Sequence, residues 1–173
     1  MQAHGFKAAF FPIGVTMGQD TYKDTGISIP PHYSLEQARE MEASGLITLG
    51  SHGYDVHELS GLDPKPIRSG MRQRKNGETE AEYVEFLSGD IARMRELLGE
   101  SAGFFAVPLN HADDLSRVIL YKNGIFATLY GKGNTTTLVR GLPQSLLAMN
   151  RLYVTGEQSG EALVSVLESA LAE

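Results

Sequence analysis

Apolar stretches alternate with amphipathic stretches about five times along this chain. Short apolar runs predict buried strands at residues 6–13, 46–49, 103–107 and 125–130, with a further strand at 151–154. Apolar residues three and four positions apart predict helices at residues 34–44, 79–98, 111–123 and 159–171. Strands that alternate with helices predict parallel strands and crossover helices, so the fold class is α/β, as a layered sheet or a barrel.

The predicted helices carry start and stop signals. Ser34 with Gln37, and Thr79 with Glu82, have the spacing of capping boxes. Asp113 and Asp114 open the third helix, where carboxylates favour the positive end of the helix dipole. The second helix is predicted to bury Tyr83, Phe86, Leu87, Ile91, Met94 and Leu98, and the last helix to bury Leu163, Val166, Leu167 and Leu171.

Length and charge narrow the class of protein. The 173 residues suit a single domain, residues 1–173, and the net charge of −6 without a basic stripe argues against nucleic acid. No apolar run is long enough to span a membrane, and the absence of cysteine excludes a disulfide scaffold. Residues 1–6 lack the pattern of a signal peptide and look like the end of a helix, which leaves the compartment undetermined.

The segment 51–57, Ser-His-Gly-Tyr-Asp-Val-His, carries the most chemistry. His52 and His57 follow directly after a predicted strand, and neutral imidazoles are common ligands of divalent metals. Histidines five residues apart do not share one face of a regular helix, so a metal site requires an irregular turn. The competing interpretation is a surface loop with two chance histidines. His111 follows another strand and faces either this site or solvent, while His32 has no identifiable partner.

These residues lie in segments that resemble one family. Residues 6–14, 50–57, 77–83 and 104–110 are similar, in order, to segments of polysaccharide deacetylases of the NodB-homology type. The histidine segment is the most specific match, because one variant of the family motif has the same five-residue spacing. The resemblance implies a deformed (β/α) barrel that removes N- or O-acetyl groups from a polysaccharide or oligosaccharide.

The resemblance also implies a site. One aspartate and two histidines hold a divalent metal in this family; His52 and His57 match the histidines. Zinc is the expected ion, with cobalt, nickel or manganese as alternatives. The backbone N–H of Leu109 corresponds to the oxyanion donor, and Tyr54, Asn110 and His111 are the expected substrate contacts.

Several family features are missing from this sequence. The motif that supplies the catalytic base and the metal aspartate is expected before Met1, so we expect the first strand and helix to be absent and the chain to be weakly active or inactive alone. Gly53 stands where Thr or Ser is usual, and Leu109 and Asn110 replace a tyrosine and a glycine. Many family members are exported or belong to the cell envelope, but this does not determine the cellular compartment of this chain.

Two alternatives to an enzyme stay open at this point. One is a degenerate domain that binds carbohydrate without turnover, and the other is a plain α/β domain with a protein partner. An incomplete barrel would also expose a strand edge, so we expect self-association, with the strand at residues 6–13 pairing across a homo-oligomer.

Overall fold

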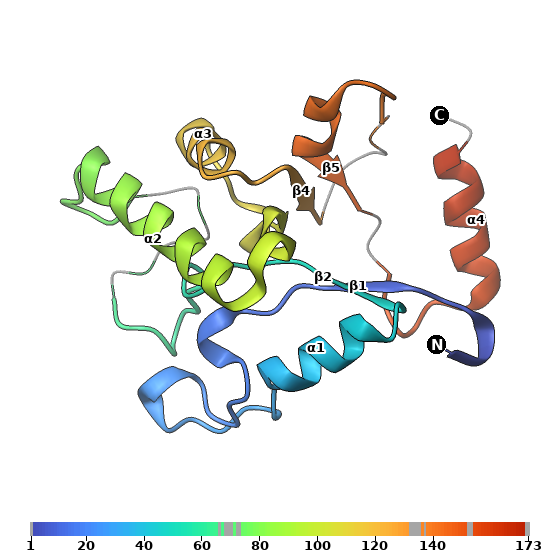
Figure 1. Cartoon of the computed structure of the whole chain (residues 1–173), viewed down its shortest axis with the longest axis horizontal. Helices are drawn as coiled ribbons and strands as arrows, with labels where there is room; N and C mark the ends of the chain where they lie inside the picture. Colours follow the sequence, from blue (N-terminus) through green and yellow to red (C-terminus); the bar gives the residue numbers. More distant parts are fainter. Residues whose placement is uncertain are drawn as a thin grey trace.

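The computed structural model describes residues 2–65, 67, 71, 74–131, 136, 138–151 and 154–171. Short parallel strands form its centre (Figure 1). Their bounds are β1 Ala8–Phe10, β2 Ile47–Leu49, β3 Phe104–Ala106, β4 Ala127–Tyr130 and β5 Met149–Asn150. β1 pairs with β2, and β3, β4 and β5 pair in that order. A parallel bridge between Ser51 and Phe105 joins the two groups, so the strands follow one another in chain order.

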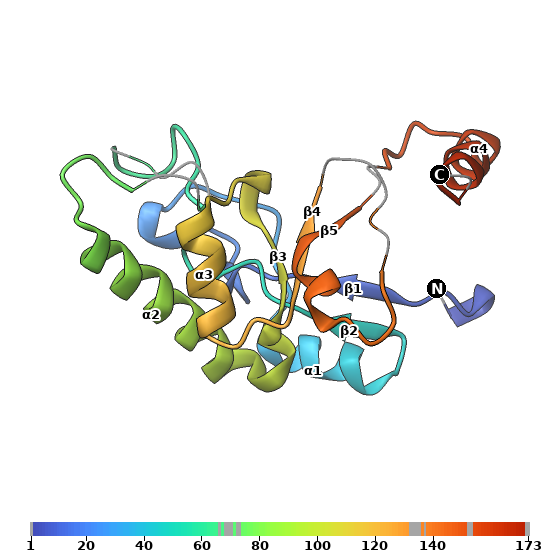
Figure 2. The same ribbon diagram turned by 90° about the horizontal axis from the view of Figure 1, so that it is seen from above.

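Helical segments connect successive strands. The α-helices are α1 Leu35–Ala43, α2 Glu80–Leu98, α3 Asp114–Lys122 and α4 Gly160–Leu171. The 3-10 helices are η1 Gln2–His4, η2 Gly14–Thr16, η3 Lys23–Thr25, η4 Gly99–Gly103, η5 Pro108–Asn110 and η6 Pro143–Ala148. α1, α2 and α3 lie beside one another along the strands, whereas α4 stands at one end of the molecule (Figures 1 and 2).

Two apolar clusters hold the helices on the strands. One joins α1, β2 and α2 through Leu49, Met94 and Leu98 among others. The second lies between α2, α3 and the strands β3 and β4, with Tyr83 and Phe105 fully buried. Burying this surface is the main stabilising force of the fold, and it leaves the carboxyl ends of the strands uncovered for the loops that follow them.

The start signals of the helices are confirmed. Thr79 accepts the backbone N–H of Glu82 while the carboxylate of Glu82 accepts the N–H of Thr79, and Ser34 and Gln37 form the same reciprocal pair. Asp113 accepts the N–H of Ser116 at 2.8 Å, which confirms its capping role. On α2 the predicted face is buried, with Phe86 only partly buried.

The carboxyl-terminal third differs from the prediction. The strand predicted at residues 151–154 lies at Met149–Asn150, because Met149 is already in register with Leu129 of β4. Residues 152 and 153 lie outside the described part of the chain. The connection from β4 contains η6, which the apolar pattern did not reveal.

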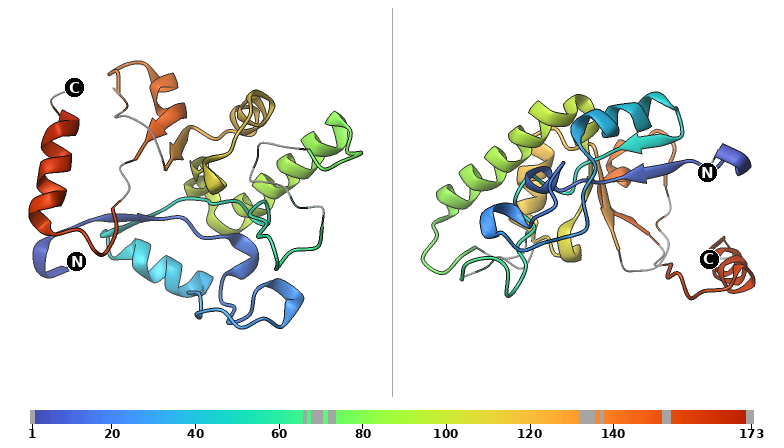
Figure 3. Two further views of the ribbon diagram at one scale, coloured as in Figure 1. Left: turned by 180° about the vertical axis from the view of Figure 1, so that it is seen from behind. Right: turned by 90° about the horizontal axis from the view of Figure 1, so that it is seen from below.

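The prediction of a buried last helix is wrong for the residues that the structure describes there. Leu163 and Val166 are only half-buried and Leu167 is 46% exposed, while the side chain of Leu171 lies outside the described part of the chain. α4 lies beyond the end of the strands (Figure 3), so its apolar face has no sheet to cover. None of the described helices is long and apolar enough to cross a bilayer.

Candidate active site

His52 is held in one orientation at the end of β2. Its Nδ1 lies 2.8 Å from the carbonyl oxygen of Ala106 at the end of β3, which places the ring proton on Nδ1 and leaves Nε2 as an acceptor. The pKa of His52 is lowered to about 4, mainly by burial and to a smaller extent by the nearby His57 and Arg151, while the hydrogen bond to Ala106 acts in the opposite direction. The ring is therefore neutral at pH 7, the form that binds a metal ion.

His57 lies beside His52 despite the five-residue spacing. The two ring centroids are 5.2 Å apart and the rings are tilted by 43°. Nδ1 of His57 is buried and has no hydrogen-bond partner in the part of the chain that the structure describes. Burial also lowers the pKa of His57. A buried, unpaired imidazole nitrogen next to a second neutral imidazole is the arrangement that a divalent ion would satisfy.

Within the described part of the chain, no third side chain completes such a site. Among the described residues no group of three or more His, Cys, Asp or Glu side chains could hold a metal ion. The two histidines thus fit the family's metal as two of its ligands, and the remaining positions would need water or other groups.

The turn between the histidines is irregular, as the spacing requires. Gly53 has a φ of +87°, and a Cβ there would lie 2.2 Å from Cγ1 of Val56. The backbone of η2 lies against the turn, because the N–H groups of Gly14 and Val15 donate to the carbonyl oxygens of Gly53 and Tyr54 at 3.0 and 2.9 Å. The absence of Thr or Ser at position 53 therefore has a steric cause in this chain.

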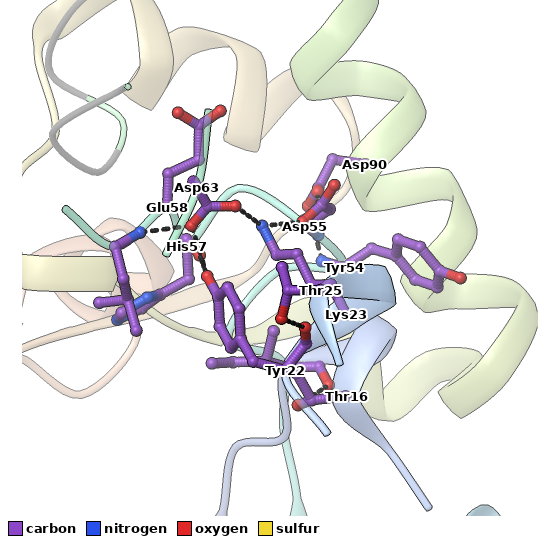
Figure 4. A network of polar contacts seen from close by, with 12 residues as sticks. Thr16, Tyr22, Lys23, Thr25, Tyr54, Asp55, His57, Glu58, Asp63 and Asp90 are labelled. Atoms are coloured by element: carbon purple, nitrogen blue, oxygen red, sulfur yellow. Dashed lines mark hydrogen bonds and ion pairs between the residues drawn. The ribbon is translucent and has the colours of Figure 1, made fainter. Parts of the chain in front are cut away.

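A buried carboxylate supports the turn from α2. Asp90 is 5% exposed, and its Oδ1 and Oδ2 accept the backbone N–H groups of Tyr54 and Asp55 at 2.8 and 2.6 Å (Figure 4). Burial raises the pKa of Asp90, while these hydrogen bonds act in the opposite direction. The sequence pattern alone assigned no role to this residue.

Polar contacts from the loop after β1 hold the far side of the turn (Figure 4). The ammonium of Lys23 pairs with Asp55 at 2.6 Å and with Asp63, and the hydroxyl of Tyr22 donates to Asp63 at 2.5 Å. Burial and the bond to Asp63 raise the pKa of Tyr22 to about 12. Burial alone would raise the pKa of Asp63, but the bonds from Lys23, Tyr22 and the N–H of Leu59 lower it. Nothing in the sequence pattern pointed to this cluster.

The turn after β3 contains Leu109 and Asn110, both in the left-handed region with φ of +53° and +58°. The N–H groups of Asn110 and His111 donate to the carbonyl oxygens of Val107 and Pro108, whereas the N–H of Leu109 has no backbone acceptor among the described residues. The side-chain oxygen of Asn110 accepts the N–H of Gly131 after β4. A backbone donor at Leu109 is therefore available to a ligand.

Cavities adjoin the turns that follow β2 and β3. A cavity of 620 Å³ is lined by Leu109, Asn110, His111, Arg117, Tyr130, Ala148 and Asn150. A second, of 420 Å³, is lined by His52, Ala106, Arg151 and residues of β1 and its surroundings. A third cavity, of 240 Å³, is lined by both His32 and His52. The sequence suggested no partner for His32, but its Nδ1 lies 2.8 Å from the hydroxyl oxygen of Thr16.

Tyr54 lies apart from the other predicted site residues. Its ring packs near Gly14 and under the guanidinium of Arg93, 5.4 Å from the ring centroid. Figure 4 shows the ring directed away from His57, toward α2. A substrate contact through Tyr54 stays a prediction.

A comparison with known families identifies the family of this chain. The sequence model described as polysaccharide deacetylase matches residues 1–128. The chain belongs to the polysaccharide deacetylase family. Members of this family act on acetylated polysaccharides and are generally metal-dependent. No curated protein matches this sequence.

Solved structures of deacetylases share the fold. A de-N-acetylase from Aggregatibacter actinomycetemcomitans superposes with a TM-score of 0.71 at 18% identity, covering 95% of this chain and 66% of that one. IcaB from Ammonifex degensii gives 0.64 at 22%, covering 98% and 64%. The deacetylase domain of BpsB from Bordetella bronchiseptica gives 0.64 at 20%, covering 87% and 62%. The expected NodB-type fold is thus confirmed, and the chain spans just under two thirds of the length of these relatives.

Proposed function

We propose that this deacetylase domain removes acetyl groups from an N- or O-acetylated polysaccharide with the help of a divalent metal held by His52 and His57. The observation that carries the proposal is the pair of imidazole rings with centroids 5.2 Å apart. In His52 the bond to Ala106 leaves Nε2 as an acceptor, and in His57 Nδ1 is buried without a partner among the described residues. Zinc suits nitrogen ligands in such a site; cobalt, nickel and manganese are the alternatives.

The surrounding residues would divide the remaining tasks. A bound divalent ion supplies an acidified water and a polarised acetyl carbonyl. The carbonyl oxygen of Ala106 keeps the proton of His52 on Nδ1, so Nε2 presents a lone pair to the ion. The N–H of Leu109, which has no backbone acceptor among the described residues, is the candidate donor to the oxyanion that forms on the acetyl group. Asn110 and His111 line the adjoining cavity, which is large enough for a sugar ring.

Turnover by this chain alone is proposed to be weak or absent. Hydrolysis needs a base to take the proton of the attacking water, and among the described residues no further His, Cys, Asp or Glu side chain joins the two histidines in a group that could hold a metal ion. The same observation favours a second candidate, a domain that binds acetylated carbohydrate without hydrolysing it. We also propose self-association, because the apolar side chains of Val164 and Leu167 on α4 are 52% and 46% exposed.

Two measurements test the proposal. The chain saturated with Zn²⁺, Co²⁺ or Ni²⁺ and then desalted should retain about one ion, and His52→Ala should lose it; retention of the ion by that variant, or none bound by the wild type, would reject the metal site. Acetate release from a chitooligosaccharide or acetylxylan then separates hydrolysis from binding. Substantial release by this chain would contradict the proposed weak turnover, while sugar binding without release would support the second candidate.

A further inference from the structure

Because the two histidines are five residues apart, the conformation of the turn between them determines how their rings lie relative to each other. No regular helix or strand covers residues 53–57, so no ladder of hydrogen bonds fixes the direction of His57. His52, by contrast, is anchored independently by the carbonyl oxygen of Ala106. The part of the pair that needs external support is therefore His57.

Asp90 supplies contacts at the two residues that decide this direction. Its two carboxylate oxygens accept the N–H groups of Tyr54 and Asp55, one oxygen to each, so both peptide planes midway between the histidines are fixed. Hydrogen bonds to an ionised acceptor are about twice as strong as neutral ones. Asp90 is carried by the 19-residue helix α2, whose neighbouring side chain Ile91 is buried in the apolar core.

The turn packs directly on this carboxylate. A Cβ at position 53 would lie 3.1 Å from Oδ1 of Asp90, so only glycine lets the backbone approach so closely without a displacement. A buried carboxylate is costly unless hydrogen bonds satisfy it, and here both of its oxygens are used on the turn. The Asp90 side chain therefore stabilises the turn between the histidines as well as belonging to the buried face of α2.

We propose that Asp90 is a positioning residue for the metal site, which holds the turn at Tyr54 and Asp55 so that His57 lies beside His52. This inference rests on the proposed function of the two histidines. A role confined to general stability would loosen both histidines alike; the contacts of Asp90 predict that His57 is affected selectively.

The first test needs no metal. In Asp90→Asn the amide oxygen can accept only one of the two backbone N–H groups, and the amide NH₂ group, itself a donor, would face the other. We expect the ¹⁵N ring signals of His57 to shift or broaden and the amides of Tyr54 and Asp55 to exchange faster, while His52 keeps its signal. Ile91→Val, which removes one methyl group at the adjacent core position, is the matched control and should leave both histidines unchanged. Equal disturbance of His52 and His57, or of neither, would overturn the proposal.

The second test uses Co²⁺ alone and a double-mutant cycle. Asp90→Asn should weaken Co²⁺ binding about 10- to 100-fold, as loss of a supporting contact typically does. In the His57→Ala background the same substitution should cost little more, because its target is already gone. Equal loss in both backgrounds would show that Asp90 does not act through His57. Wild-type protein that binds no Co²⁺ would reject the proposed metal site, and the ring signals would still decide the role of Asp90.

Discussion

The turn after β2 and the turn after β3 lie at the same edge of the parallel strands but are held differently. The histidine turn is fixed from two sides, by the buried carboxylate of Asp90 and by the ion pairs of Lys23. The turn at Leu109 and Asn110 instead places two consecutive non-glycine residues at positive φ and is tied across to β4 by one side-chain contact.

The difference matches what each turn would have to do. A metal ligand must be rigid within a fraction of an ångström, so the histidine turn gains from many buried contacts. A backbone donor such as the N–H of Leu109 needs only the correct peptide orientation, which a left-handed pair of residues can supply at a cost of about 1–3 kcal/mol per strained residue. The histidine turn should therefore tolerate substitution least.

The largest effect is expected at Gly53. Gly53→Ala places a Cβ 2.2 Å from Cγ1 of Val56 at a φ of +87°, which combines backbone strain with an overlap. We expect a loss of about 2–4 kcal/mol in the free energy of unfolding, measured with denaturant. Gly61→Ala is the matched control, because its φ is +91° and nothing lies within 4 Å of its Cβ. Equal losses at both positions would show that the contact with Val56 does not matter.

The contrast between the turns also explains which features the sequence could predict. Helix starts such as Thr79 with Glu82 depend on neighbours three residues apart, so local pattern was sufficient. The apolar pattern predicted the first four strands in the correct order, but the predicted strands were too long. Only three or four residues of each strand pair with a neighbouring strand. Hydrophobicity alone does not report whether a helix finds a sheet to cover, which is why the prediction for α4 failed.

The site was predictable only where residues are close in sequence. His52 and His57 were predicted as metal ligands from their position after a strand and from the family match. The contacts that orient them join positions 35 to 54 residues apart, as between Asp55 and Asp90 or between His52 and Ala106. Such long-range pairs depend on how the strands and helices pack, and a single sequence contains no periodic signal for them. The link between Lys23 and Asp63 was invisible for the same reason.

A smaller effect is expected from the ion-pair side of the histidine turn. Asp63→Asn keeps a hydrogen-bond acceptor but removes one charge beside Lys23, which retains Asp55 at 2.6 Å. We expect a loss of about 1–2 kcal/mol at pH 7. Asp24→Asn, next to Lys23 in the loop after β1 but exposed, should change little.

The pH dependence of this effect follows from the lowered pKa of Asp63. The folded protein binds this proton less readily than the unfolded chain, so the contribution is complete above the unfolded value of about 3.9. It is lost as the pH falls through the lower folded pKa. The difference between wild type and Asp63→Asn should therefore shrink in acid, and a difference that grew below pH 4 would contradict the assignment.

The smallest effect is expected at the turn after β3. Asn110→Gly removes the contact with Gly131 but relieves the positive φ, so the two changes partly cancel and the net loss should be below about 1 kcal/mol. Gly131→Ala should be more harmful, because its Cβ would lie 2.7 Å from the side-chain oxygen of Asn110. If that contact is the cause, Gly131→Ala should become nearly neutral when combined with Asn110→Gly. A double variant that loses the sum of the two single losses would show that the turn after β3 has a support other than Asn110, and the contrast with the histidine turn would then disappear.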